Sequence, residues 1–597
     1  MCGIVGYVGK KDAVSVLIAG LKALEYRGYD SSGIAVHNGA SLSVVKRAGR
    51  IANLERALAE KPIVGHSGIG HTRWATHGLA TDINAHPFVS LYGKFAVVHN
   101  GIISNYPELA SFLHARGITF SSDTDSEVVA HLLDLFYTGD VLAALRRVVG
   151  LLKGSFALGV ISVYEPNVVY GVRKDSPLIV GRGESGFALC SDISGISDIC
   201  DECYPLENGE IVRIDAESAR AYDFDGKKKE ISFSCRECEE IADRDPGVDD
   251  MLCEIRQTPT ALLLGEERFP RELIRSFLSE DFDDILVLGC GSAYHAGLVF
   301  REAMREMCGE RVRVEIASEY LSQREDFDDN RLVIAVSQSG ETADTLLAVE
   351  KAKRMGAKIL SVCNVEASSL VRLSELAVIT RCGRERAVAA TKSYVTQVHE
   401  LMMICLEYAD VKGKIEKSEL ETLKRELLLI PDKAEQVVAE EYYLSDIAIR
   451  IKDAEAVFYL GRGADFCAAR EGSLKLKEVS YLFSEAYPSG ELKHGTLALM
   501  EEGVFGLIIA TDPRLAEKNA ATASEIACRG ASSIVIASES IAAEMRADYV
   551  VVIPDTDPLF SPMLSSIALQ QLAYFVAKAR GCDVDKPRNL AKSVTVE

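Results

Sequence analysis

The chain has no long apolar run. None of its hydrophobic segments approaches the ~18 consecutive apolar residues that span a bilayer, so we expect no membrane-spanning segment. The start lacks a basic stretch followed by an apolar one; no signal peptide is predicted, and we expect a cytoplasmic protein. Basic residues are outnumbered, 66 against 88 acidic ones, and the net charge of −22 opposes nonspecific contact with nucleic acid or anionic lipid. We therefore expect neither nucleic acid nor a membrane as partner.

Paired cysteines are also scarce. Most of the 15 cysteines are single and lie in apolar segments, which favours reduced thiols over disulfides. The exceptions are two C-x2-C pairs, Cys200 with Cys203 and Cys235 with Cys238. Their separation is longer than in the usual two-knuckle zinc site, and they flank a polar stretch. We expect no metal site there, with structural zinc as the alternative.

The length of 597 residues predicts three or four compact domains. The first six residues, MCGIVG, contain a candidate nucleophile. Removal of Met1 would leave Cys2 with a free α-amine, whose reference pKa of about 7.7 to 8.0 suits it to take the thiol proton. The apolar pair that follows, Ile4 and Val5, predicts a buried strand. The alternative is an ordinary buried cysteine.

Three further segments carry polar groups. In the run from Gly68 to Gly78, Arg73 suits a carboxylate and Thr76 adds a hydroxyl, as recognition of an amino-acid head group requires; a surface loop is the alternative. An expected strand ends at Asn100-Gly101, whose side-chain amide and backbone N–H are the two donors of an oxyanion hole, unless they form a plain turn. Residues 122–127 open a helical pattern, with one carboxylate left to bind an amino group.

These motifs resemble the glutaminase domain of N-terminal-nucleophile glutamine amidotransferases. The resemblance rests on MCGIVGY, LEYRGYDSSG, HTRWATHG, VVHNGII and SDTDSE, in the family's order. It implies a four-layer αββα fold in which Cys2 attacks the glutamine amide and releases ammonia. It also implies further roles for Arg73, Thr76 and His77 at the carboxylate, Asp125 at the amino group, Asn100 and Gly101 at the oxyanion, and Trp74 as the gate of the ammonia channel.

The second half of the chain is repeated. The segment from Ile285 to Gly291 recurs from Val457 to Gly463, and each copy is followed by a helical pattern and further apolar strands. This alternation predicts two doubly wound parallel-sheet domains, so the expected fold class is α/β and multidomain. A dinucleotide fingerprint is incomplete, because residue 294 is Tyr where the pattern requires glycine. We expect no cofactor.

The segment from Ser337 to Thr345 joins an apolar strand to a helical pattern. Its hydroxyls, its glycine and the expected helix N-terminus supply many donors and no cation, which suits a sugar phosphate; a serine-rich helix cap is the alternative. The segment resembles the phosphate loop of sugar-isomerase (SIS) domains.

Three later motifs extend the resemblance over essentially the whole chain. EGSLKLKEV, EAYPSGELKHG and the tail PRNLAKSVTVE resemble the glucosamine-6-phosphate synthase family. The resemblance implies glutamine and fructose 6-phosphate as substrates and a homodimer with His494 donated across the interface. Lys592 would form an imine with the sugar, Glu478 would move a proton, Lys475 would assist and His494 would open the ring. The implied sugar-binding residues are Gly291, Ser292, Ser337, Gln338, Ser339, Thr342, Val388 and Ala591.

Ala293 and Ala390 depart from this family, which usually has serine at both positions. An amidotransferase for another ketose phosphate therefore remains an alternative, as does a nonenzymatic sugar-phosphate sensor. The expected domains are 2–215 glutaminase, 216–250 linker, 251–420 first SIS domain, 421–582 second SIS domain with a helical connector, and 583–597 catalytic tail.

The tail poses a chemical problem. A solvated lysine has a pKa of about 10.4 and is a poor nucleophile at neutral pH. We therefore expect the tail to fold into the sugar site, where burial or a nearby cation lowers the pKa of Lys592.

Overall fold

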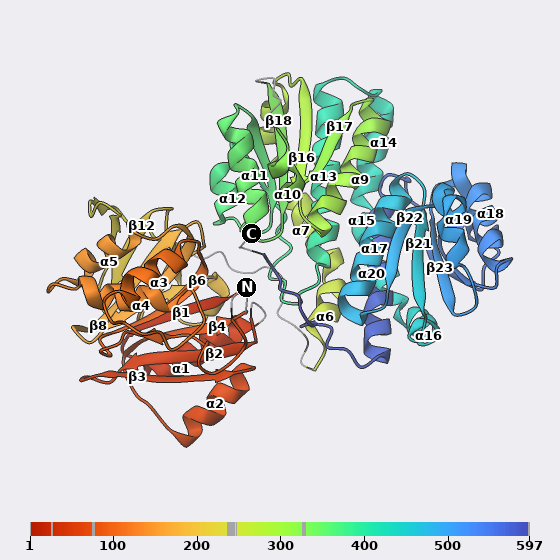
Figure 1. The fold of residues 1–597 in the computed structure, drawn as a ribbon. Coiled ribbons are helices and arrows are strands. Elements are labelled where there is room, and N and C mark those ends of the chain that lie inside the picture. Colours follow the sequence, from red (N-terminus) through yellow and green to blue (C-terminus); the bar gives the residue numbers. More distant parts are fainter. Residues whose placement is uncertain are drawn as a thin grey trace. The chain divides into compact units, whose positions relative to one another are not determined.

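The computed structural model describes residues 2–25, 28–74, 78–235, 241, 245, 247–324 and 330–594. The chain divides into two compact units, which Figure 1 shows as ribbons and which we describe separately. The first unit is Met1–Cys238 with Ser593–Glu597, and the second is Glu239–Lys592.

The first unit contains two antiparallel sheets. The eight-stranded sheet has the order β15-β11-β9-β10-β1-β4-β2-β3 and the seven-stranded sheet the order β14-β13-β12-β8-β7-β6-β5. The strands of the first are β1 (Gly3–Gly9), β2 (Ser31–His37), β3 (Leu42–Ala48), β4 (Ser67–Arg73), β9 (Ile179–Gly183), β10 (Gly186–Cys190), β11 (Glu202–Pro205) and β15 (Ser234–Cys235). Those of the second are β5 (Phe88–Val89), β6 (Phe95–Ile103), β7 (Gly154–Ser162), β8 (Glu165–Lys174), β12 (Glu210–Ile214), β13 (Ala219–Asp223) and β14 (Lys228–Lys229).

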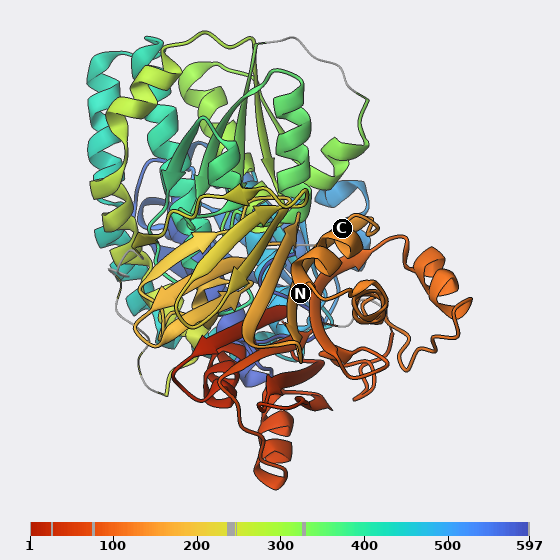
Figure 2. The ribbon, with the colours of Figure 1, turned by 90° about the vertical axis from the view of Figure 1, so that its left-hand side faces the viewer.

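Alternation along the strands creates the layers of this unit. On β1, Ile4 and Val8 point into the core between the two sheets, whereas Val5 and Tyr7 point to the opposite face. That face is covered by α1 (Ala13–Ala23) and α2 (Ile51–Glu60). Helices α3 (Tyr106–His114), α4 (Glu127–Phe136) and α5 (Val141–Val149) pack on the seven-stranded sheet, as Figure 2 shows in orange beside gold strands. The layers are thus helix, sheet, sheet, helix, as predicted.

The sheets of the first unit continue beyond residue 215. Strands β13, β14 and β15 lie in the stretch 216–250, whose polar composition predicts a linker. These strands are short and lie at or near sheet edges, where polar side chains are tolerated, so composition alone did not distinguish them from a connection.

The second unit contains two five-stranded parallel sheets. Their orders are β17-β16-β18-β19-β20 and β22-β21-β23-β24-β25. The strands of the first are β16 (Asp284–Gly289), β17 (Val312–Ile316), β18 (Arg331–Ser337), β19 (Lys358–Cys363) and β20 (Leu376–Ile379). Those of the second are β21 (Ala456–Gly461), β22 (Ser484–Pro488), β23 (Val504–Ala510), β24 (Ser532–Ser538) and β25 (Tyr549–Ile553).

Helices surround both sheets. The helices from α6 to α13 are α6 (Asp250–Arg256), α7 (Thr258–Arg268), α8 (Arg271–Leu278), α9 (Ser292–Cys308), α10 (Ala317–Ser322), α11 (Ala343–Arg354), α12 (Ser369–Leu373) and α13 (Lys392–Val411). Then follow α14 (Lys417–Leu428), α15 (Ile430–Ala439), α16 (Glu441–Ile451), α17 (Ala464–Ser480), α18 (Ala516–Ala527), α19 (Glu539–Ala542) and α20 (Ser561–Ala579). No helix in the described part of the chain is long and apolar enough to cross a membrane.

The predicted duplication is confirmed in backbone geometry. Gly291 ends the turn after β16 with φ 56° and ψ −126°, and Gly463 ends the turn after β21 with φ 57° and ψ −126°. Each glycine precedes a helix of 17 residues, α9 or α17, and these two helices pack together. In both sheets the first strand has neighbours on either side, which places a ligand-binding crevice at its carboxyl end.

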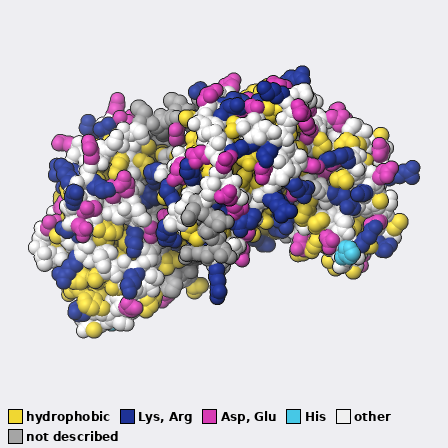
Figure 3. All heavy atoms as spheres, turned by 90° about the horizontal axis from the view of Figure 1, so that it is seen from above, with side chains coloured by type: hydrophobic (Ala, Val, Ile, Leu, Met, Phe, Trp, Pro, Cys, Tyr) yellow, Lys and Arg dark blue, Asp and Glu magenta, His cyan; other side chains and the backbone are white. Residues whose placement is uncertain are grey.

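Charged side chains of both signs are mixed over the coloured residues on the face of the molecule that Figure 3 shows.

Candidate active sites

Cys2 lies immediately before β1, beside the end of β4. Pairing of Gly3 with Thr72 brings it next to Trp74, whose N–H donates to the Cys2 Sγ at 3.4 Å. Burial raises the pKa of the Cys2 thiol, against the opposing charge of Arg73. A thiol in this setting needs a base to become a nucleophile.

Asn100, near the end of β6, points its amide nitrogen at the same residue. Its Nδ2 donates to the Cys2 carbonyl oxygen at 3.0 Å, and its Oδ1 lies 3.0 Å from His71 Nε2. Burial lowers the pKa of His71 to about 3, so the ring is neutral. Because His71 Nε2 also faces the His99 carbonyl oxygen at 3.0 Å, it is the protonated nitrogen, and it fixes which way the Asn100 amide points.

The sequence alone suggested no role for His71, although this residue stands in the HTRWATHG motif.

Gly101 follows Asn100 with φ +116°, and a Cβ there would lie 2.1 Å from the Ser155 carbonyl oxygen. Glycine is therefore required at this position, which keeps the backbone beside Asn100 unobstructed.

Two opposite charges lie near Cys2. Arg73 is buried and donates to the carbonyl oxygens of Gly78 and Leu79, each at 3.2 Å. Asp125 is buried too, and its carboxylate accepts from the Ile103 N–H at 2.8 Å. Both charges influence the pKa of the Cys2 thiol, the arginine lowering it and the aspartate raising it. The structure thus gathers Cys2, Trp74, Asn100, Arg73 and Asp125, whereas Thr76 and His77 lie outside the described residues.

The second site lies at the carboxyl edge of the first parallel sheet, where β16 and β18 are neighbours. Ser337 Oγ accepts from the Gly340 N–H at 3.0 Å and lies 3.4 Å from Thr342 Oγ1. Ser339 Oγ accepts from the Glu341 N–H at 3.2 Å. The predicted loop residues Ser337, Gln338, Ser339 and Thr342 thus form one turn leading into α11, next to the turn that contains Gly291 and Ser292.

Helix α17 contributes a charged cluster to this edge. Lys475 Nζ lies 2.6 Å from Glu478, 3.3 Å from Glu471 and 3.1 Å from Ser292 Oγ. Burial alone would lower the pKa of Lys475, but the two carboxylates raise it, so this lysine stays protonated. Glu471 also accepts from His295 Nδ1 at 2.8 Å. Glu471 and His295 were not predicted, although Glu471 stands one helical turn before Lys475 in the EGSLKLKEV motif.

The tail brings Lys592 to a carboxylate. The Lys592 side chain is 5% exposed, and its Nζ forms an ion pair with Glu385. Sequence reasoning expected burial or a nearby cation; the side chain is buried, but its neighbour is an anion. Close by, the Val388 N–H donates to the Asp585 carbonyl oxygen at 3.0 Å, and Ala591 is half-buried.

His494 is separate from these groups. It lies at the end of a short 3-10 helix (Ser489–His494) and is exposed. Within the described part of the chain, its ring has no hydrogen bond or ion pair, so this single chain does not bring it to Lys475 or Glu478.

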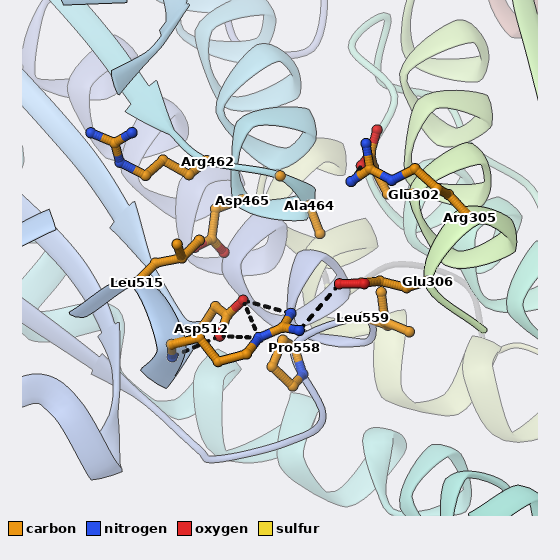
Figure 4. Close-up of a pocket in the computed structure, with 12 residues that line it drawn as sticks. Glu302, Arg305, Glu306, Arg462, Ala464, Asp465, Asp512, Leu515, Pro558 and Leu559 are labelled. Atoms are coloured by element: carbon orange, nitrogen blue, oxygen red, sulfur yellow. Dashed lines mark hydrogen bonds and ion pairs between the residues drawn. The ribbon is translucent and has the colours of Figure 1, made fainter. Parts of the chain in front are cut away.

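A cavity of about 330 Å³, shown in Figure 4, lies at the turn of Gly463, the position in the second copy that corresponds to Gly291 in the first. Counted from Gly291 and Gly463, Glu306 on α9 occupies the position of Glu478 on α17. Arg514 donates to Asp512 at 2.8 Å and to Glu306 at 3.2 Å, and Asp465 accepts from the Thr511 N–H at 3.0 Å. Paired charges thus replace the hydroxyl-rich loop of the first copy.

The two C-x2-C pairs lie partly outside the described residues. Cys200 and Cys203 are buried, and pairing of β11 with β15 places Ser234 opposite Cys203 and Cys235 opposite Glu202. Nothing is described for Cys238.

Comparison with known proteins gives matches over both units. Residues 71–198 match the glutamine amidotransferase domain, and residues 280–406 and 450–577 each match the SIS domain. The chain is 43% identical to a glutamine--fructose-6-phosphate aminotransferase [isomerizing] of Clostridium tetani and 42% identical to one of Thermococcus kodakarensis, in both cases over 100% of either chain. A solved C-terminal domain of glucosamine-fructose-6-phosphate aminotransferase from Francisella tularensis superposes with a TM-score of 0.55 at 32% identity, covering 58% of this chain and 100% of that one.

Proposed function

This chain belongs to the glutamine–fructose-6-phosphate aminotransferase (isomerizing) family, and from that premise we propose how its residues perform the reaction. The amide nitrogen of glutamine is transferred to fructose 6-phosphate, giving glutamate and glucosamine 6-phosphate. One observation carries the assignment: helix α17 of the second SIS domain brings Lys475 and Glu478 to Ser292, beside the phosphate loop of the first.

The first unit releases ammonia. After removal of Met1, the α-amine of Cys2 accepts the thiol proton and the sulfur attacks the glutamine amide carbon. Asn100 Nδ2 and the Gly101 N–H stabilise the oxyanion, and the α-ammonium of Cys2 gives its proton to the departing nitrogen, which leaves as ammonia. Water then hydrolyses the thioester, which releases glutamate and restores the thiol. Arg73, Thr76 and His77 hold the substrate carboxylate, and Asp125 holds its amino group. Glu127 has a structural role instead, because its carboxylate accepts hydrogen bonds from the Ser121 and Ser122 N–H groups.

The second unit aminates and isomerises the sugar. The loop from Ser337 to Thr342 binds the phosphate, with Val388 and Ala591 against the sugar chain. His494 opens the ring, and the Lys592 amine then forms an imine at C2 with loss of water. Ammonia displaces the lysine, and Glu478 moves a proton from C1 to C2 while Lys475 supplies a protonated partner. The cavity near Arg514 has paired charges in place of the hydroxyl-rich phosphate loop, so we assign one sugar to each chain.

Two further assignments complete the proposal. Trp74 gates ammonia, which must reach the sugar without loss to solvent. We place the enzyme in the cytoplasm, because its buried single thiols suit a reducing compartment.

Incubation with glutamine and fructose 6-phosphate tests this function. We expect hexosamine phosphate and glutamate in equal amounts, and excess glutamate from Trp74→Ala, because ungated ammonia escapes. Other ketose phosphates serve as competing substrates, since Ala293 and Ala390 replace hydroxyls near the sugar. If neither fructose 6-phosphate nor any other ketose phosphate gives a hexosamine, the proposal is refuted. If another ketose phosphate is turned over faster than fructose 6-phosphate, that ketose is the substrate instead.

A further inference from the structure

The tail that carries Lys592 makes several contacts that do not involve the charge of this lysine. The Asp585 carboxylate accepts from the Asp250 N–H at 2.9 Å and the Met251 N–H at 2.8 Å, at the start of α6. Farther along, the Arg588 N–H donates to the Tyr481 hydroxyl at 2.7 Å. The tail thus has docking contacts besides the ion pair between Lys592 and Glu385, so this ion pair can serve a chemical role as well.

Glu385 is itself fixed firmly. Its side chain is fully buried, and its Oε1 accepts from the Thr391 N–H at 2.9 Å and the Ser393 N–H at 3.1 Å, at the N-terminus of α13. Its Oε2 accepts from Ser393 Oγ at 2.6 Å and from Lys592. Burial alone would raise the pKa of Glu385, but Lys592 and these donors lower it to about 2. The carboxylate is ionised throughout the neutral range, and it cannot turn away from Lys592 without losing these bonds.

We propose that Glu385 is the positioning residue of the imine-forming lysine: its fixed carboxylate holds the Lys592 nitrogen as a cation before and after the sugar is captured. The proposal rests on the function assigned to Lys592 above. An ammonium and a ketone combine to give a protonated imine and water, so the positive charge stays on the same nitrogen. Glu385 therefore neutralises both states, and it favours the protonated imine, which is the form that ammonia attacks most readily at C2.

Other titratable groups surround this pair. Glu254 on α6 accepts from the Ala387 N–H at 3.1 Å, and burial, together with the charge of Glu385, raises the pKa of Glu254 to about 8. Lys392 on α13 donates to Gln257 at 2.8 Å, and the buried Cys382 has a raised pKa. At neutral pH Glu254 and Cys382 are mostly uncharged. Glu385 is then the anion that faces Lys592, and Glu254 provides a matched control: a second buried glutamate in the same cluster with little charge to lose.

The test is the pH dependence of borohydride trapping of fructose 6-phosphate on Lys592. Trapping needs a transiently neutral amine, and an adjacent carboxylate holds that amine protonated. For Glu385→Gln we expect the pH of half-maximal trapping to fall by about one to three units, the usual effect of removing one close opposite charge. Below neutral pH, Glu254→Gln should keep the wild-type profile, because glutamine resembles the protonated acid already present.

Three results separate the possibilities. An unchanged midpoint in Glu385→Gln overturns the positioning role, even if trapping is weaker at every pH. If Glu385→Gln does not fold, Glu385→Asp decides: its shorter side chain draws the carboxylate away from Lys592, so the midpoint should fall by part of that shift. An unchanged midpoint in Glu385→Asp would again overturn the positioning role. Absence of label at Lys592 in the wild-type enzyme instead refutes the proposed function, independently of Glu385.

Discussion

At the scale of single residues, both sites depend on neighbours that hold a reactive group in one orientation or charge state. His71 orients the Asn100 amide toward Cys2, and Glu385 forms an ion pair with Lys592. Neither neighbour was predicted as functional, because the sequence around a histidine in a strand or a glutamate before a helix does not show which distant residue it contacts. Their roles follow only from which residues the fold brings next to them.

Cys2→Ala separates the two reactions. The change removes the sulfur nucleophile but leaves Arg73 and Asp125 in place, so glutamine should still bind while its hydrolysis is lost. The sugar half does not use Cys2, and fructose 6-phosphate should still be trapped on Lys592. Glutamate release and borohydride labelling, measured on the same preparation, check this prediction. Intact-mass analysis of the wild type should also show Met1 absent; glutamine-dependent synthesis by the alanine variant would refute the role of Cys2.

At the scale of elements, one pair of helices builds the sugar site. Helix α9 begins at the first crevice and α17 at its counterpart, and because they pack together, each extends its later turns toward the start of the other. Lys475 reaches Ser292 in this way and carries Glu478 with it as an ion-pair partner, and Glu306 reaches Arg514. The same arrangement gives a sugar site in one copy and an ion-paired crevice in the other, because only one copy kept the hydroxyl-rich loop.

The tail is the element whose docking decides whether Lys592 is in place. Asp585→Ala removes the carboxylate that accepts from two N–H groups at the start of α6, at an expected cost of about 0.5 to 2 kcal/mol, as for other helix caps. Because the cap joins the tail to α6, this energy is lost from tail docking. We expect faster proteolytic removal of the tail and a higher KM for fructose 6-phosphate, with glutamine hydrolysis in the absence of sugar unchanged. Equal protease resistance in variant and wild type would contradict this role.

At the scale of the whole molecule, alternation and repetition in the sequence predicted more than composition did. The repeated glycine turns at Gly291 and Gly463 identified the two parallel-sheet domains, because such a repeat can be seen in the chain itself. The pattern at Ile4 predicted one buried strand, and the four-layer fold of the first unit was implied by the resemblance of its motifs. The limits of the first unit were not predicted, since β13 to β15 have the polar composition of a linker. The anion beside Lys592 was also missed, because Glu385 is distant in sequence and belongs to none of the recognised motifs.

The position of His494 leads to a prediction about assembly. We propose that a second copy of this chain supplies His494 to each sugar site, because the residue is exposed and makes no polar contact with Lys475 or Glu478 within the described part of its own chain. His494→Ala and Lys592→Arg should each be inactive alone, since the first lacks the ring-opening group and the second cannot form the imine. In a mixed dimer, however, the His494→Ala chain keeps Lys592 and receives His494 from its partner. One of the two sites is then complete.

Co-expression with two different tags, followed by purification on both, isolates such mixed dimers. We expect about half of the wild-type rate of glucosamine 6-phosphate formation, because closed two-fold symmetry gives one complete and one doubly defective site per dimer. The matched control pairs Lys592→Arg with Lys475→Ala; these residues serve the same chain's site, so neither site is complete and no activity should return. If His494 acted within its own chain, the first pair would be as inactive as the control. Recovery confined to the His494 pair is therefore the result that only an exchanged histidine produces.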